Sequence, residues 1–180
     1  MIYFLPNLLS NSESKNLLQI FETEKKITPS SDVSRILSGT KNSYGFRPIS
    51  DDFNFYLDKL KSKVIEFNPT ITNLINVNTY VREYRNKSFL EKHIDRKDIS
   101  ITMSICLEST IEKEWPLNAT FNDTNYSFNT NVGDGILLFN ADKILHWREK
   151  LNCDDSQRVV QFFLHWKPDF SKQKEQKTII

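Results

Sequence analysis

Apolar residues recur along this chain with two different spacings, and the change falls near Pro69. Before Pro69 they stand at intervals of three and four, first behind the run of N-cap residues Ser10 to Ser14. This spacing is typical of amphipathic helices, so it predicts one helix from that run to about Lys25 and another from about Asp51 to Phe67. The stretch between them, residues 27–48, is rich in turn-forming residues and is expected to be a loop with room for a short strand.

Beyond Pro69 apolar and polar residues alternate, which is the pattern of strands with one buried face. In residues 100–107 the alternation is clean, because every second residue is apolar. Clusters of Asn, Asp, Ser and Gly separate these segments. The predicted strands are residues 2–5, 76–84, 100–107, 119–121, 126–128, 135–139 and 159–166. Two helices followed by many short strands predict an α+β fold that is mainly β, a barrel or sandwich with the N-terminal helices packed on one side.

Composition agrees with one folded domain. The chain has 180 residues, of which 38% are hydrophobic and 12% aromatic, so it can bury a core and does not resemble a disordered chain. No repeat or linker divides it. We therefore expect a single domain over residues 1–180, with its β core at about 76–168 and a polar tail at 169–180.

Charge and cysteine content limit the cellular location and the partners that we expect for the protein. The net charge is +1, from 24 basic and 23 acidic residues, so no strong field attracts nucleic acid or an anionic membrane. No apolar run reaches the roughly 18 residues of a membrane span, and the N-terminus lacks the features of a signal peptide. Cys106 and Cys153 form neither a CxxC pair nor a disulfide framework. These observations predict an intracellular, cytoplasmic protein without nucleic-acid or membrane partners, and they leave the oligomeric state open.

The first motif with chemical meaning is His93-Ile94-Asp95. Residues i and i+2 of an extended chain point to the same side, so this imidazole and this carboxylate can converge on one ion. A second imidazole, from His146 just after the predicted strand 135–139, completes the two-His, one-carboxylate set of non-haem iron(II) enzymes. The alternatives are a surface loop for an isolated His-x-Asp, and zinc for the complete set.

Arg158 adds a cation to this set, 12 residues after His146 and at the start of the next predicted strand. A 2-oxoglutarate co-substrate chelates the metal through its keto acid end, and its far carboxylate needs a cation deeper in the barrel. Arginine offers that carboxylate a permanent charge and a bidentate partner. The alternative is a surface or capping arginine. Together with the metal ligands, the position of Arg158 predicts an anchor for 2-oxoglutarate.

The residues of this set lie in three stretches: YRNKSFLEKHID, residues 84–95; GDGILLFNADKILHWR, residues 133–148; and RVVQFFLHW, residues 158–166. In these stretches the chain resembles the iron(II)/2-oxoglutarate-dependent oxygenases of the double-stranded β-helix (jelly-roll) fold, and within them the prolyl 4-hydroxylase-like branch. The resemblance runs from about residue 76 to 167. It implies a dioxygenase that uses Fe(II), 2-oxoglutarate and O2 to hydroxylate an unactivated C–H bond.

The same resemblance assigns a role to Tyr84, because a Tyr commonly stands nine residues before the first metal ligand, here His93. It implies that Tyr84 helps bind 2-oxoglutarate; the alternative is a buried strand aromatic. The chain departs from the branch at Lys87, where Gly is frequent, and at Arg158, where Lys is frequent. The branch's Gly-Gly-Glu-Thr-like stretch is missing, and residues 114–117 stand near its place. These departures bear on the substrate more than on the cofactor.

The resemblance implies peptidyl proline as the substrate, with a free amino acid or another small molecule as the alternative. Residues 27–47 and the loop 111–115 are expected to shape the substrate mouth. Two other classes of protein stay open: a non-catalytic β-barrel binding module, and a cupin-like metal enzyme without 2-oxoglutarate.

Four further residues need the structure to place them. Arg82 has the strand parity of a pocket residue, and the alternative is a solvated or paired arginine. Trp147 either lines the substrate mouth or packs beside the metal site, and Arg148 is a second candidate for the mouth. His165 has the opposite strand parity to Arg158, so we expect it to be structural and to point away from the pocket.

Overall fold

The computed structural model of the protein describes residues 1–27, 44–48 and 50–171, which form two α-helices and ten strands. The helices are α1 (Asn11–Ile27) and α2 (Asp52–Phe67). The strands are β1 (Ile2–Leu5), β2 (Tyr44–Phe46), β3 (Leu74–Tyr84), β4 (Leu90–His93), β5 (Ile101–Ser109), β6 (Leu117–Phe121), β7 (Thr124–Phe128), β8 (Gly135–Phe139), β9 (Leu145–Arg148) and β10 (Val159–Pro168).

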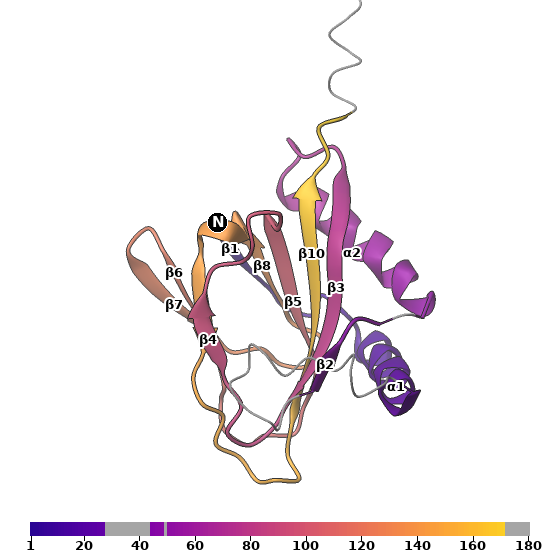
Figure 1. Ribbon diagram of the computed structural model, residues 1–180, viewed down its shortest axis with the longest axis vertical. Coiled ribbons are helices and arrows are strands. Elements are labelled where there is room, and N and C mark those ends of the chain that lie inside the picture. The colour runs from indigo at the N-terminus through magenta and orange to yellow at the C-terminus, as the bar shows by residue number, and fades with distance from the viewer. Residues whose placement is uncertain (28–43, 49, 172–180) are drawn as a thin grey trace, which may run out of the picture.

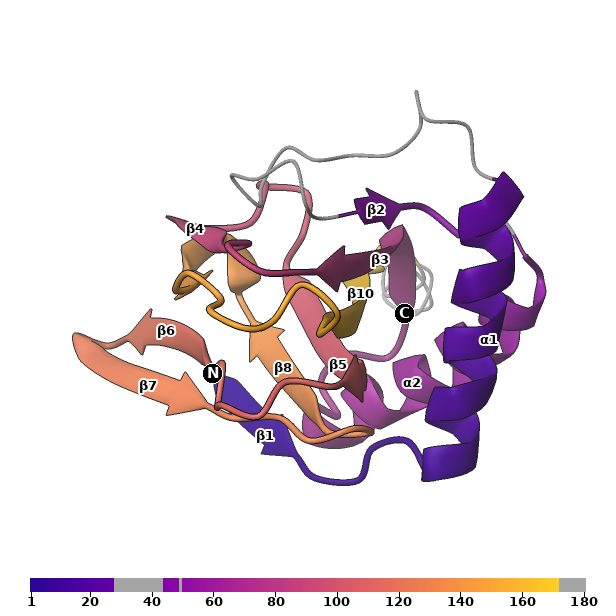
Figure 2. The same cartoon turned by 90° about the horizontal axis from the view of Figure 1, so that it is seen from below.

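The strands form two antiparallel sheets. The larger sheet has the order β1-β8-β5-β10-β3-β2, and the smaller one the order β4-β9-β6-β7. Helices α1 and α2 lie on one side of the larger sheet, and the smaller sheet lies on the other side (Figures 1 and 2). This arrangement confirms the predicted fold, which is mainly β with a jelly-roll core and N-terminal helices packed on one side. The space between the two sheets is where the candidate site lies.

Helix α1 begins with a capping box that is readable in the sequence. Ser10 Oγ accepts a hydrogen bond from the backbone N–H of Glu13 at 3.3 Å, and the Glu13 carboxylate accepts one from the backbone N–H of Ser10 at 2.9 Å. Two N–H groups that the helix itself leaves unpaired are thereby satisfied. Glu13 also pairs with Lys59 of α2, which ties the two helices together.

Alternation along the central strands divides their side chains between two environments. On β10, Val160, Phe162 and Leu164 are buried among the apolar residues of α1 and α2. Phe163 and His165 have the opposite parity and line a cavity between the two sheets. Strand β5 divides in the same way, and its apolar face joins the helix-side core as predicted. Strand parity therefore decides which residues can reach a ligand.

Strands β4 and β9 were not predicted, and β2 lies in a stretch expected to be mostly loop. Each is only three or four residues long, which is too short to display a period of two. The connection from β3 to β4 contains Lys87 with a φ of 68°, in the left-handed region. Glycine adopts this conformation most easily, and here a lysine adopts it instead.

No helix in the described part of the chain is both long and apolar enough to cross a membrane. Residues 28–43, most of the first predicted mouth segment, and residues 172–180, most of the predicted tail, lie outside the described residues.

Candidate metal centre

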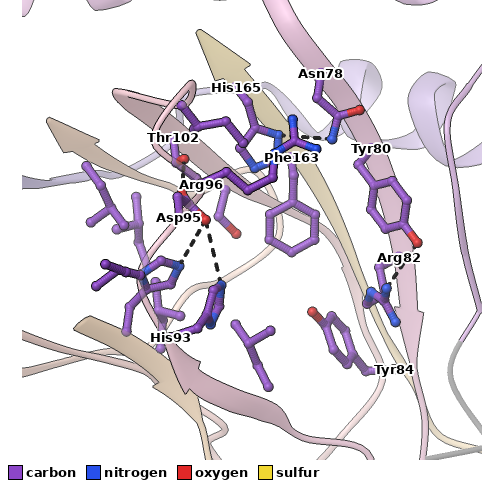
Figure 3. A pocket seen from close by; sticks show the side chains of 18 residues that line it. Asn78, Tyr80, Arg82, Tyr84, His93, Asp95, Arg96, Thr102, Phe163 and His165 are labelled. Atoms are coloured by element: carbon purple, nitrogen blue, oxygen red, sulfur yellow. Dashed lines mark hydrogen bonds and ion pairs between the residues drawn. The ribbon is translucent and has the colours of Figure 1, made fainter. Parts of the chain in front are cut away.

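Two short paired strands of the smaller sheet place two imidazoles side by side. His93 ends β4, its register partner on β9 is His146, and the two ring centroids are 4.2 Å apart. Asp95 follows β4 closely, and its backbone N–H donates to the carbonyl of Ala141 at 3.2 Å. Its carboxylate faces both imidazoles (Figure 3). The structure thus brings together the three metal ligands that the sequence predicts.

Each imidazole has one ring nitrogen engaged with the backbone. Nδ1 of His93 donates to the carbonyl of Glu91 at 2.8 Å, and Nδ1 of His146 donates to the carbonyl of Ile144 at 2.9 Å. A carbonyl can only accept, so in the neutral ring the proton is on Nδ1 and the lone pair is on Nε2. The two Nε2 atoms lie 3.7 and 3.8 Å from Oδ1 of Asp95. All three groups therefore present lone pairs to a common point.

The carboxylate of Asp95 is oriented by a neighbour on β5. Its Oδ2 accepts a hydrogen bond from the Thr102 hydroxyl, which leaves Oδ1 directed at the imidazoles. The ligand atoms of His93, Asp95 and His146 all lie within 4.8 Å of one another, as atoms around one ion do. Two imidazoles and one carboxylate leave coordination positions open for other ligands, which is the arrangement of non-haem iron(II) oxygenases. The residues present fit that ion.

The electrostatics of Asp95 and His146 favour their metal-binding forms, and those of His93 favour its protonated form. Burial raises the pKa of Asp95, but its contacts with His93, His146 and Thr102 outweigh burial and hold that pKa below its usual value. Burial lowers the pKa of His146, so this ring is neutral at pH 7. Burial also lowers the pKa of His93, but the neighbouring Asp95 carboxylate and the Glu91 carbonyl raise it above its usual value overall. A bound cation would displace the proton that His93 attracts.

A cavity of about 490 Å³ lies between the two sheets beside these ligands (Figure 3). Much of its wall is apolar, and these residues are Leu90, Ile94, Ile99, Leu117, Ile136, Leu138 and Phe163. A row of alternate residues of β3 forms a polar side: Asn78, Tyr80, Arg82 and Tyr84. The cavity therefore offers a largely apolar space next to the metal ligands, with polar groups along one strand.

Arg82 lines this cavity, as its strand parity predicted, and it is at the same time a paired arginine. It is 3% exposed, and its Nη2 donates to the Tyr80 hydroxyl at 3.0 Å. Tyr84 also lines the cavity and is at the same time a buried strand aromatic, with its ring centroid 5.0 Å from that of Trp115. Burial raises the pKa of Tyr84, so its phenol keeps its proton and can donate a hydrogen bond. Its predicted role in co-substrate binding stays a prediction.

Arg158 does not lie where the sequence suggested. Its Nε donates to Glu108 at 2.5 Å and its Nη1 to Glu83 at 2.8 Å, and Nη1 also lies 2.5 Å from a carboxylate oxygen of Glu22 on α1. Burial lowers the pKa of Arg158, but its ion pairs with Glu108 and Glu22 outweigh burial and raise it. Its guanidinium is not among the groups that line the cavity at the metal ligands. The expectation that Arg158 enters the barrel is therefore wrong.

Strand parity explains this correction and a second one. Arg158 shares the parity of Val160 and Phe162, whose side chains turn to the helices, so its own side chain turns to α1. His165 has the opposite parity and lines the cavity, with its Nδ1 3.5 Å from the side-chain nitrogen of Asn78. The expectation that His165 points away from the pocket is also wrong. Strand parity correctly predicted that Arg158 and His165 lie on opposite sides of β10. The cavity side, however, was assigned to Arg158 when it belongs to His165.

Besides Arg82, a second buried arginine of the interior is Arg148. It stands two residues after His146 on β9, on the same strand face, and is 2% exposed. It lies in the interior beside Trp115, not at a mouth. Trp115 ends the predicted mouth loop 111–115 and is itself buried, so this end of the loop closes the interior. Trp147 has the opposite parity, and Lys92 lies over its ring.

Thr102, Ser104 and Gln161 are among the polar residues of the interior that were missed in the sequence. Thr102 orients Asp95, and Gln161 of β10 is fully buried and accepts a hydrogen bond from Ser104 at 3.0 Å. The signal for Thr102 and Ser104 was present, because both are the polar members of the clean alternation in β5. The signal for Gln161 was its place as a lone polar residue in the apolar run VVQFFL.

The fold is shared with solved 2-oxoglutarate- and iron(II)-dependent oxygenases. No protein-family model and no curated protein matches the sequence. Solved structures do match. With a TM-score of 0.71 and 12% identity, 92% of the chain overlays on 85% of an oxidoreductase of the 2OG-Fe(II) oxygenase family from Burkholderia pseudomallei.

Two further matches are solved with a peptide or a small molecule bound. A prolyl hydroxylase from Trichoplax adhaerens, in complex with a hypoxia inducible factor peptide, gives a TM-score of 0.67 at 13% identity, with 98% of this chain and 87% of that chain covered. HygX from Streptomyces hygroscopicus, with nickel, 2-oxoglutarate and hygromycin B bound, gives 0.68 at 12% identity, with 94% and 83% covered. The resemblance to this superfamily, including its prolyl hydroxylases, is confirmed at the level of the fold.

Proposed function

We propose that the protein is an iron(II)- and 2-oxoglutarate-dependent dioxygenase that hydroxylates an unactivated C–H bond. The observation that carries this proposal is the convergence of His93, Asp95 and His146 on one point, with each ligand oriented by a hydrogen bond to a neighbouring group. The fold shared with a solved 2OG-Fe(II) oxygenase supports it.

In this proposal His93, Asp95 and His146 hold the iron. With 2-oxoglutarate and O2, the iron supplies the oxidising power for hydroxylation, and succinate and carbon dioxide are released. The chain's own contribution is to fix the ligands, to keep open positions on one side of the ion, and to exclude water through the apolar cavity wall. Tyr84, as a buried hydrogen-bond donor on the wall, is suited to hold a carboxylate of the co-substrate.

The substrate is either a peptidyl proline or a small molecule such as a free amino acid. The Trichoplax prolyl hydroxylase takes a peptide, and HygX was solved with the small molecule hygromycin B. Both substrates need an approach to the cavity, which is lined by residues from both sheets. Succinate formation with proline peptides, compared with succinate formation with free amino acids, separates the two classes.

The test is metal binding followed by turnover. Under nitrogen, the wild-type protein is expected to bind one Fe(II) per chain and to develop the weak visible absorption of the iron and 2-oxoglutarate chelate. Admission of air should then release succinate. His146→Ala removes one of the three ligands, so it should lose the chelate absorption and at least about 100-fold in succinate formation.

His165→Ala is the matched control for metal binding, because His165 lines the same cavity but is not one of the grouped ligands. This variant is expected to retain one Fe(II) per chain. Chelate absorption without succinate release for any proline peptide or amino acid would favour a binding module, and tight zinc binding without keto acid chelation would favour a different metal enzyme. Either result would contradict the proposal.

A further inference from the structure

The end of the barrel behind His146 holds buried hydrogen-bond donors that lack an acceptor. Arg148 Nη1 donates to the carbonyl of Trp115 at 2.6 Å, but Nη2 has no hydrogen-bond partner among the described residues. The guanidinium carbon lies 4.8 Å from the centroid of the Trp115 ring, so its flat face is covered. A buried guanidinium with no carboxylate beside it is costly to fold, because its charge is taken from water without compensation.

A second donor without a partner lies on the adjoining wall. Gln161 of β10 is fully buried, and its Oε1 accepts from Ser104, but its Nε2 has no partner among the described residues. Arg148 and Gln161 line the same small cavity of about 200 Å³. Two buried donors at one cavity, one of them a cation, require an acceptor that is anionic and has more than one oxygen.

Tyr84 connects this group to the metal cavity. Its ring packs against Trp115, the same residue that covers Arg148, while Tyr84 itself lines the cavity at His93 and His146. Arg148 stands two residues beyond His146 on one strand face, which places its backbone about 7 Å further into the barrel. Arg148 itself lines the smaller cavity and not the one at the metal ligands, so a short dicarboxylate that chelates the metal reaches Arg148 only past Tyr84 and Trp115.

We infer that Arg148, assisted by Gln161 and Tyr84, binds the far carboxylate of the keto acid co-substrate, and that Arg158 does not. This inference rests on the proposed function. In it, the carboxylate supplies the missing acceptor for Arg148 Nη2 and Gln161 Nε2, and the Tyr84 phenol donates a further hydrogen bond. Arg158 already has three carboxylate partners, and its side chain lies on the helix side of the larger sheet.

The experiment measures what the far carboxylate contributes to binding. The dissociation constants of 2-oxoglutarate and of 2-oxopentanoate, which has a methyl group in place of that carboxylate, are measured on the Fe(II)-loaded protein under nitrogen, by chelate absorption and by calorimetry. The wild-type protein should prefer 2-oxoglutarate at least about 30-fold. Arg148→Met should abolish this preference while 2-oxopentanoate still binds. Arg158→Met and Arg82→Met should keep it.

A second variant guards against misfolding of the first. Gln161→Leu should reduce the preference about three- to tenfold, since it removes one neutral donor. A preference that survives in Arg148→Met, or that disappears in Arg82→Met or Arg158→Met instead, would overturn the inference and leave the oxygenase proposal standing. Equal binding of both acids by the wild-type protein would overturn it as well. If the wild-type protein formed no chelate with either acid, both proposals would fail together.

Discussion

Arg148 and Arg158 are close in sequence, but their side chains lie on opposite sides of the larger sheet. Arg158 faces α1, where Glu22, Glu83 and Glu108 surround its guanidinium. Arg148, on β9 of the smaller sheet, faces the barrel interior and donates to a backbone carbonyl there. Both side chains are largely buried, but only one has its charge compensated by the protein itself. The satisfied arginine holds the structure together, and the unsatisfied one is suited to a ligand.

The two regions also differ in what surrounds the arginine. On the helix side, Glu83 is fully buried and also accepts from Lys25 of α1 and from Arg85, so the charges form a connected network between helix and sheet. In the interior, Arg148 has an aromatic ring, a carbonyl and an amide as its neighbours. Charge compensation, more than position in the sequence, therefore distinguishes a structural cation from a ligand-binding one.

The largest expected effect that tests this comparison is on stability. Arg158→Met leaves the buried carboxylate of Glu83 and the carboxylate of Glu108 without one of their cations, so the free energy of unfolding should fall by roughly 2–3 kcal/mol. Lys25 and Arg85 remain beside Glu83 and limit the loss. Urea unfolding followed by circular dichroism measures the change.

The matched control is Arg148→Met in the same unfolding experiment. An apolar side chain of similar length replaces a buried cation that the protein does not neutralise, so the free energy of unfolding should change by less than about 1 kcal/mol or increase. If Arg148→Met were the more destabilised of the two variants, Arg148 would be the structural cation and the comparison would be reversed.

A smaller effect is expected from pH, again on the helix side. Burial raises the pKa of Glu83, but the hydrogen bonds from Lys25 and Arg85 outweigh burial and hold the pKa below its usual value. The stability that this carboxylate contributes is therefore fully present above the pKa of an unfolded Glu, about 4.3, and is lost as the pH falls through the lower folded value.

The measurement compares the wild-type protein with Glu83→Gln between pH 7 and pH 3. The variant should be less stable at pH 7, and the difference between the two proteins should shrink as the solution becomes acidic. A difference that stays constant over this range would mean that the charge of Glu83 does not contribute to stability.

The smallest expected effect concerns the interior. Tyr84→Phe removes one neutral hydrogen-bond donor and keeps the packing on Trp115, so 2-oxoglutarate should bind about three- to tenfold more weakly to the Fe(II)-loaded protein. Tyr80→Phe is the matched control, because Tyr80 lines the same cavity and its hydroxyl accepts from Arg82. A stronger effect of Tyr80→Phe would move the co-substrate contact towards Arg82.

The sequence was informative where a pattern is long enough to repeat. Both helices and the longer strands were predicted close to their observed bounds, and the capping residues of α1 were among those named. The three metal ligands came together as expected, because a His-x-Asp pair needs only local extended geometry and His146 follows a well-marked strand. Local spacing and residue chemistry were sufficient for these features.

The sequence did not predict which side of a strand faces the helices and which side faces the smaller sheet. Arg158 and His165 were both placed on the wrong side of β10, since the spacing of residues gives their relative parity but not the absolute direction. The pairing of β4 with β9, which brings His93 to His146, joins short segments far apart in the chain. The role of Arg148 depends on the absence of a carboxylate beside its guanidinium among the described residues. A single sequence does not show which side chains come close to it.

Strand β9 carries His146 and Arg148 on the same face, and hydrogen bonds hold it between β4 and β6. An extended backbone has almost no freedom to lengthen or shorten between two alternate residues, so the distance between His146 and Arg148 along the strand is nearly constant. An acid that spans from the ion to the guanidinium must have the number of carbons that fits this distance. If Arg148 binds the far carboxylate as we infer, the backbone of this one short strand selects among keto acids by their chain length.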